Sequence, residues 1–389
     1  MGIDFQNVTF KYYKKASSKQ LDNVTFHINE KNEFVTILGQ TGSGKSTLVQ
    51  HMNGLLFASS GIVDVFDQKV IKSKKVKLKP IRKHVGLVFQ FSEYQLFEST
   101  VLQDIMFGPK NFGKTKEEAY ELAINACKLI GIPEDLYERS PFSLSGGQMR
   151  RVAIAGALAI DPDILILDEP TVGLDPKGKE ELMNLLVDIQ NKTHKSIIMI
   201  THDMNIVAKY AKRVLVMNHG KLVYDGNKHT LFENQEFLEK YNLDLPNIAS
   251  VAKELKERQL IDFDTLPLTK EDLYKVIVKE EKNNEYQREN NGLGTRGRVV
   301  GGRRGDVHRA GGSFPRGGRT PEGRRLRFPA QPHGHGLGRR GVRGGLPPRS
   351  HRDGRERRVA DADPQPREVR AAFGLRPVEG RGTERARSL

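Results

Sequence analysis

Apolar residues in the first 230 positions fall into two kinds of run. Residues 3–10 and 24–28 alternate apolar with polar positions, which is the pattern of strands with one face in water. Four later runs are short and continuously apolar, the pattern of strands covered by helices on both faces: 35–38, 85–89, 164–167 and 197–200. The pattern predicts an α/β fold in which a mostly parallel sheet is accompanied by an antiparallel subsheet near the N-terminus.

The pattern changes twice further along the chain. Residues 214–217 and 222–224 flank the turn-rich Asn218-His219-Gly220 and predict a hairpin, so we place the end of the first domain, residues 1–226, there. Residues 227–291 have helical spacing of apolar residues among charges, with a break at Leu266-Pro267, and predict a small helical accessory domain. We expect the remaining segment, residues 292–389, to be a disordered Arg/Gly-rich tail.

The net charge of +15 belongs to that last segment. Residues 292–389 hold 24 arginines, no lysine and 9 acidic residues, which leaves 39 basic and 39 acidic residues in positions 1–291. The neutral part gives no general electrostatic reason to expect nucleic-acid binding. An RNA-binding tail is one interpretation of the segment, but its only aromatic residues are Phe314, Phe328 and Phe373. The sudden change in Lys and Arg usage favours an altered reading frame or a fused vector-derived segment.

A glycine-rich loop follows directly after the apolar run 35–38. Between a strand and a helix, such a loop turns its backbone N–H groups around a phosphate, while Lys45 reaches the β and γ oxygens and the Ser46 hydroxyl can ligate Mg²⁺. A chance glycine turn is the alternative, and the strand before the loop and the apolar residues after it argue against that. The sequence predicts an ATP-binding loop made of Gly39, Gln40, Thr41, Gly42, Ser43, Gly44, Lys45, Ser46 and Thr47.

Two adjacent carboxylates end the apolar run 164–167. At the tip of a parallel strand both can face the crevice where ligands bind, so we expect Asp168 to hold Mg²⁺ and Glu169 to polarise the attacking water. The alternative is a capping pair for a helix that follows Pro170.

A second glycine-rich segment precedes an apolar helical stretch. Leu144-Ser145-Gly146-Gly147-Gln148 can bind an anion through exposed N–H groups and the helix dipole. These five residues match in full the signature sequence of the ABC ATPase superfamily, which the chain resembles. In that resemblance Tyr12 or Tyr13 is the aromatic residue that stacks on adenine. The same resemblance implies a Q-loop glutamine that also reaches the metal, a D-loop aspartate and a switch histidine, which here are Gln90, Asp175 and His202.

Longer stretches resemble the ATPases of energy-coupling factor (ECF) transporters, closest to the A′ type. They are residues 89–91, 95–98, 100–105, 107–109 and 148–156, and the likeness covers residues 1 to about 288. It implies a head-to-tail dimer, favoured as a heterodimer with a related ATPase, in which Ser145 and Gly147 act on the partner's ATP. It also implies a transmembrane T subunit, substrate-binding S subunits, vitamin or metal-ion import, and a place on the cytoplasmic face of the membrane.

Three rival functions remain open at this point. They are a soluble ABC ATPase acting on ribosomes or DNA, the ATPase of an ordinary binding-protein-dependent importer, and a catalytically silent partner. The absence of an apolar run near 18 residues and of a basic-then-apolar leader means that a membrane role comes through a partner. The single cysteine, Cys127, excludes an intrachain disulfide, and its helical neighbours predict a buried thiol.

Overall fold

The computed structural model describes residues 2–13, 18–72 and 77–293. The predicted tail, residues 292–389, lies almost wholly outside them. Residues 1–287 belong to one compact unit, which contains every element from β1 to α10 and most of α11 (Lys270–Leu293).

The predicted antiparallel subsheet is present and has four strands. β1 (Gly2–Phe10) pairs with β2 (Leu21–Asn29) on one side and with β4 (Ser60–Val65) on the other, and β4 continues to β5 (Gln68–Lys69). Every pairing in this sheet is antiparallel. The pattern analysis foresaw β1 and β2 but not β4 and β5.

The second sheet has six strands in the order β10-β9-β3-β8-β7-β6. The four strands with continuous apolar runs, β3, β8, β7 and β6, are parallel to one another, as predicted. β9 lies parallel to β3 and forms the predicted hairpin with β10 at one edge of the sheet. The strands are β3 (Phe34–Leu38), β6 (Val85–Val88), β7 (Ile164–Asp168), β8 (Ser196–Ile200), β9 (Arg213–Asn218) and β10 (Lys221–Gly226).

The parallel strands bury both faces. Leu165 and Leu167 of β7 join the hydrophobic cluster formed by the helices of one side, whereas Ile164 and Ile166 join a cluster with the antiparallel sheet and α1. This alternation explains the unbroken apolar runs, because each side chain of such a strand faces one of two cores. It also holds β7 rigidly, so the residue at its end has a fixed position.

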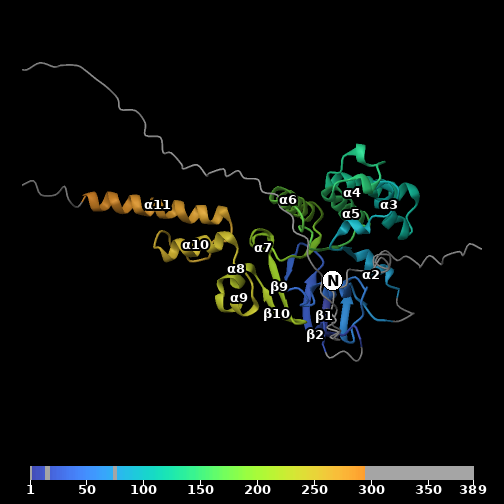
Figure 1. Ribbon diagram of the computed structural model, residues 1–389, viewed down its shortest axis with the longest axis horizontal. Helices are drawn as coiled ribbons and strands as arrows, with labels where there is room; N and C mark the ends of the chain where they lie inside the picture. The colour runs from blue at the N-terminus through green and yellow to red at the C-terminus, as the bar shows by residue number, and fades with distance from the viewer. Residues whose placement is uncertain (1, 14–17, 73–76, 294–389) are drawn as a thin grey trace, which may run out of the picture. The chain divides into compact units, whose positions relative to one another are not determined.

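Helices α3, α4 and α5 pack on one another and share a hydrophobic core with one face of the large sheet (Figure 1). Helix α4 begins with a Thr115–Glu118 capping box and ends at Gly131 in the left-handed conformation, which are strong boundary signals. Cys127 of α4 is buried, as predicted, and burial raises the pKa of its thiol to about 11. The helices of the first domain are α1 (Lys45–Met52), α2 (Lys79–His84), the short 3₁₀ helices η1 (Ser92–Gln95), η2 (Glu134–Leu136) and η3 (Pro141–Ser143), α3 (Val101–Asn111), α4 (Lys116–Ile130), α5 (Gly146–Leu158), α6 (Pro176–Thr193) and α7 (Met204–Tyr210).

Residues after Gly226 form the expected helices, namely α8 (Lys228–Glu233), α9 (Gln235–Tyr241), α10 (Asn247–Glu257) and α11. Leu231 and Phe232 of α8 are fully buried in one cluster with Leu38 and Val214 of the sheet. The accessory helices therefore share a core with the edge of the large sheet. The boundary at Gly226 stays a prediction, since no gap in packing marks it.

The turn of the β9–β10 hairpin lies against the glycine-rich loop. The Gly220 N–H donates to the Ser43 carbonyl at 2.9 Å, and the Asp22 N–H donates to the Gly220 carbonyl at 2.8 Å. A Cβ atom at Gly44, whose φ is +105°, would lie 2.4 Å from the Gln20 carbonyl oxygen. Backbone from three separate segments thus meets at the base of the loop, and only glycine fits there.

Candidate functional site

The predicted site residues lie at the carboxyl ends of neighbouring parallel strands of the large sheet. β3, β8, β7 and β6 are adjacent and parallel, and Ile37, Ile200 and Asp168 lie in register across them. The glycine-rich loop, the histidine segment, the carboxylate pair and Gln90 come directly after the carboxyl ends of these four strands. Open α/β sheets bind their ligands at the carboxyl ends of their parallel strands.

The glycine-rich loop has the backbone shape that phosphate binding needs. Gly39, Gly42 and Gly44 have φ values of +141°, +78° and +105°, which disfavour other residues. The Lys45 ammonium donates to the carbonyls of Gly39 and Gln40 at 2.8 and 3.0 Å, so its charge lies over the loop. Helix α1 begins at Lys45, so its N-terminal end lies at the same glycine-rich loop.

Asp168 is buried beside the start of α1. Burial raises the pKa of its carboxyl to about 6, while a hydrogen bond with the Ser46 side chain opposes the rise, and the nearby charge of Glu169 adds to it. Helix α6 starts only at Pro176, with Asp175 as its cap, so Asp168 and Glu169 are not the capping pair of the alternative interpretation. A buried carboxylate hydrogen-bonded to a hydroxyl is a suitable pair of oxygen ligands for Mg²⁺.

Glu169 and His202 face each other. Glu169 Oε1 lies 3.0 Å from His202 Nδ1, and the side chain of Glu169 is 12% exposed whereas that of His202 is 72% exposed. Glu169 has a φ of +48°, which is uncommon for a residue with a side chain. Its second oxygen, Oε2, is buried and is one of the buried side-chain atoms without a hydrogen-bond partner in the described structure. Oε2 is thus an acceptor that the described protein groups leave unsatisfied.

Gln90 is exposed at the end of β6, as expected for a residue that reaches toward a ligand. The segment after it turns sharply, because Phe91 has a φ of +55°, and then forms η1. Gln95 at the end of η1 accepts a hydrogen bond from the Phe89 N–H through Oε1 at 3.1 Å. The loop that carries Gln90 is thus closed on itself across six residues.

The signature segment forms the N-terminus of α5. Ser145 Oγ accepts from the Gln148 N–H at 3.3 Å and Gln148 Oε1 accepts from the Ser145 N–H at 2.9 Å, a capping box. A Cβ atom at Gly146 or Gly147 would meet nothing within 4 Å, so this face of the turn is open. An open helix N-terminus with two glycines suits a phosphate supplied from another molecule.

The two tyrosines differ in their surroundings. Tyr12 contacts Phe10 edge-on, with ring centroids 5.0 Å apart, and its hydroxyl lies 3.3 Å from the Thr47 hydroxyl. Tyr13 is 77% exposed. The contact with Thr47 brings Tyr12 to the start of α1 and favours it over Tyr13 as the adenine-stacking residue.

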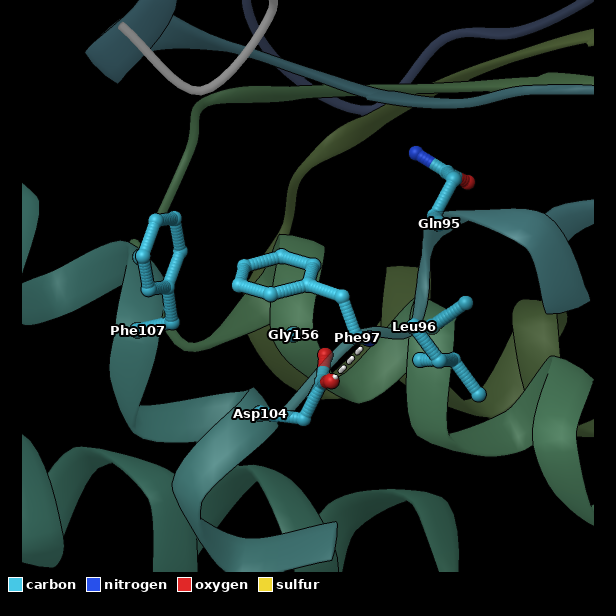
Figure 2. Close-up of a pocket in the computed structure, with 8 residues that line it drawn as sticks. Gln95, Leu96, Phe97, Asp104, Phe107 and Gly156 are labelled. Atoms are coloured by element: carbon cyan, nitrogen blue, oxygen red, sulfur yellow. Dashed lines mark hydrogen bonds between the residues drawn. The ribbon is translucent and has the colours of Figure 1, made fainter. Parts of the chain in front are cut away.

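The loop after Gln90 also borders a pocket between η1, α3 and α5 (Figure 2). Asp104 accepts hydrogen bonds from the Phe97 and Glu98 N–H groups at 2.8 and 2.9 Å, and burial raises the pKa of its carboxyl. Phe97 packs edge-on against Phe107, and Tyr94 nearby is 80% exposed. Apolar rings therefore line an accessible surface next to the site.

Sequence reasoning missed a buried charge on the signature helix. Arg150 of α5 is buried, and burial lowers the pKa of its guanidinium while the charge of Glu93 in η1 opposes that. The two residues are far apart in sequence, and nothing in their local pattern indicates that the fold brings their charges near enough to influence each other.

Two absences apply to the described residues. None of their helices has the length and apolarity to cross a bilayer. Nor do His, Cys, Asp and Glu side chains of residues 2–13, 18–72 and 77–282 gather in a group of three or more that could hold a metal ion.

Comparison with known proteins identifies relatives of this chain. The sequence pattern of the ABC transporter family matches residues 21–172. The energy-coupling factor transporter ATP-binding protein EcfA2 of Streptococcus pyogenes serotype M5 (strain Manfredo) is 47% identical over 283 residues, which are 71% of this chain and 99% of the relative. The same protein from serotype M1 matches equally well.

Solved structures are similar too. CbiO1 from Clostridium perfringens, described as part of the ABC transporter complex CbiONQ, has a TM-score of 0.56 and 38% identity, covering 64% of this chain and 98% of its own. The ATP-binding cassette MJ0796, solved as a dimer in a post-hydrolysis state with ADP and Pi, has a TM-score of 0.52 and 32% identity, covering 58% and 98%.

Proposed function

This chain belongs to the ABC transporter family as an energy-coupling factor transporter ATP-binding protein, and from that premise we propose how its residues hydrolyse ATP and transmit the result. It is the ATP-hydrolysing subunit of an importer and works with transmembrane and other subunits. The observation that carries the proposal is the contact of Glu169 with His202 directly beyond the glycine-rich loop.

The residues divide the chemistry among them. The loop Gly39–Thr47 holds the phosphates through its N–H groups, Lys45 carries the charge for the β and γ oxygens, and Tyr12 stacks on the base. Glu169 orients the attacking water and accepts its proton, while His202 holds Oε1 through Nδ1. Nε2 of His202 is the ring atom left to stabilise a γ-phosphate oxygen.

We also propose that Ser46, Asp168 and Gln90 hold Mg²⁺. The fit rests on the Ser46–Asp168 hydrogen bond and on the burial of Asp168, whose charge a cation would compensate. When bound, the ion neutralises charge that develops on the β and γ oxygens. The role of this chain is to keep a carboxylate, a hydroxyl and an amide ready at one edge of the sheet.

The working unit is a head-to-tail dimer, with a related second ATPase as the favoured partner. The open turn of Ser145, Gly146 and Gly147 supports this, because its N–H groups suit a phosphate bound on the facing subunit. Gln148 keeps the turn in place through the capping box, and Asp175, which starts α6, is assigned to the same interface.

The surface after Gln90 is the proposed contact with the transmembrane T subunit. Phe91, Tyr94 and Phe97 are 39%, 80% and 44% exposed, and large exposed apolar groups so close together indicate a protein interface. Asp104 fixes the backbone beneath Phe97 (Figure 2). Movement of Gln90 toward ATP would shift this aromatic surface, because Gln90 and the surface lie on one short segment of the chain. Substrate-binding S subunits complete an importer of vitamins or metal ions at the cytoplasmic face of the membrane.

Co-purification in detergent tests this proposal. Residues 1–291, tagged in the native host, should bring down a T-type membrane protein, a second ATPase and several small S subunits. Tyr94→Ala with Phe97→Ala should lose the membrane proteins and keep the second ATPase. Ribosomal or DNA-associated proteins with no membrane partner would overturn the proposal, and a single solute-receiving permease would favour an ordinary importer.

A further inference from the structure

We propose that Lys179 is a positioning residue for hydrolysis, because its ion pair with Asp203 fixes the His202 segment to the first turn of α6. The inference rests on the proposed roles of Glu169 and His202. Lys179 Nζ lies 2.9 Å from Asp203 Oδ2, with the two side chains 36% and 19% exposed. Lys179 does not reach the site itself and acts through its neighbour.

Asp203 holds its segment at three points. Its Oδ1 accepts from the Asn205 and Ile206 N–H groups at 3.1 and 3.3 Å and so caps α7. Its own N–H donates to Thr201 Oγ1 at 3.1 Å. Its Oδ2 accepts a hydrogen bond from the Lys179 ammonium. Because Thr201 and Asp203 flank His202 in the chain, the backbone of His202 lies between two fixed residues.

The His202 ring needs such support. It is 72% exposed, so its packing against the protein does little to orient it, and Nδ1 contacts Glu169 Oε1 at 3.0 Å. Burial alone would raise the pKa of Asp203, but the hydrogen bond and charge of Lys179 outweigh burial and lower it. Asp203 is therefore an ionised carboxylate at neutral pH.

Lys179 also connects His202 to the proposed dimer contact. The Lys179 N–H donates to the Asp175 carbonyl at 2.9 Å, and Asp175 Oδ1 caps the same turn by accepting from the Gly178 N–H at 3.1 Å. One helical turn thus separates Asp175 from the ion pair. A shift of Asp175 on dimer closure would move Lys179, Asp203 and His202 together.

A second ion pair between the same helices provides a matched control. Lys209 of α7 lies 2.8 Å from Glu180 of α6, with side chains 43% and 59% exposed. It joins α6 to α7 as Lys179 does, but Lys209 is seven residues from His202 along the chain. Loss of this pair removes a similar amount of helix-to-helix contact without touching the residues beside His202.

The test compares ATPase kinetics of the full-length chain, purified with its native membrane partners. We expect Lys179→Met to lower kcat about tenfold with KM for ATP changed by less than about twofold, since misplaced catalytic groups reduce turnover and not binding. Lys209→Met should keep kcat within about twofold of the wild type. Lys179→Arg should restore most of kcat. Asp203→Asn keeps a capping oxygen and should lower kcat similarly, without a further loss in the double variant.

Two results would overturn the inference. One is equal kcat for Lys179→Met and Lys209→Met, and the other is a raised KM at unchanged kcat. Wild-type and Glu169→Gln proteins run alongside separate this from the proposed function. If Glu169→Gln hydrolysed ATP like the wild type, the proposed role of Glu169 would be refuted. If Glu169→Gln were inactive and Lys179→Met had normal kcat, only the positioning role of Lys179 would be refuted.

Discussion

His202 Nδ1 lies 3.0 Å from Glu169 Oε1, although the two residues are separated by a whole helix and strand in sequence. The contact forms because β7 and β8 are parallel neighbours whose carboxyl ends meet at one edge. Glu169 has a left-handed backbone conformation at this point, which is uncommon for a residue with a side chain.

Glu169→Gln should reduce kcat by roughly 10² to 10⁴ because the amide cannot accept the proton of the attacking water. ATP binding should be retained, and the dimer should stay closed with ATP. Steady-state hydrolysis, together with size-exclusion chromatography in ATP, measures both effects. Undiminished turnover would remove Glu169 from the role of general base.

Lys45→Ala should weaken ATP binding first, since it removes the charge that lies over the loop. We expect a loss of at least about tenfold in affinity, measured by titration with a fluorescent ATP analogue. Lys128→Ala is a suitable control because Lys128 is an exposed residue of α4, in the group of helices α3, α4 and α5 away from the loop. Equal affinity for both variants would count against the loop assignment.

Ser145→Arg should abolish hydrolysis and leave the affinity of the chain's own loop for ATP unchanged. The bulky cation blocks the open turn that is assigned to the facing subunit's phosphate. Mixing the variant with an intact second ATPase and measuring binding and turnover separately tests this. A matched loss of binding and turnover would place Ser145 at the chain's own nucleotide.

Asp168→Asn should stabilise the protein in the absence of nucleotide and Mg²⁺. The folded-state pKa of Asp168 is about 6 against an unfolded value of 3.8, so above pH 6 the folded protein bears a buried charge that the substitution removes. The gain should be about 1–3 kcal/mol at pH 8 and should vanish as pH falls through 6 toward 4. Urea unfolding at several pH values measures it, and lower stability at pH 8 would contradict the assignment.

His51 should act in the opposite direction. Burial lowers its pKa to about 4 from 6.5, so between these values the unfolded chain takes up a proton that the folded chain refuses, and stability falls as pH decreases. As pH falls from 6 to 4, His51 lowers the free energy of unfolding and Asp168 raises it, so the two contributions cancel in part. Between pH 8 and 4, His51→Gln should therefore lose less stability than the wild type as pH falls, whereas Asp168→Asn should lose more. The same denaturation series shows whether the two slopes separate.

The parallel strands could be predicted because burial on both faces leaves a continuous apolar run, as in residues 164–167. β4 could not, because its first three residues are exposed and it includes Gly61 and Asp64. It exists through pairing with β1. The fold of the antiparallel sheet is thus partly a tertiary effect.

The site residues could be named from their motifs, but their contacts could not. Lys179 and Asp203 are 24 residues apart, and each is an ordinary charged residue in its local pattern. Arg150 likewise gives no signal of its burial. Such pairs depend on how α5, α6 and α7 pack, which periodicity along one segment does not contain.

The contact of Gly220 with Ser43 and Asp22 makes the hairpin turn a part of the nucleotide loop's foundation. A hairpin turn at a sheet edge is ordinarily the place where sequences gain or lose residues between related proteins. Here a single inserted residue would displace a backbone donor from the loop. Protein engineers who seek a site for a fluorescent tag or a circular permutation should leave residues 218–220 intact.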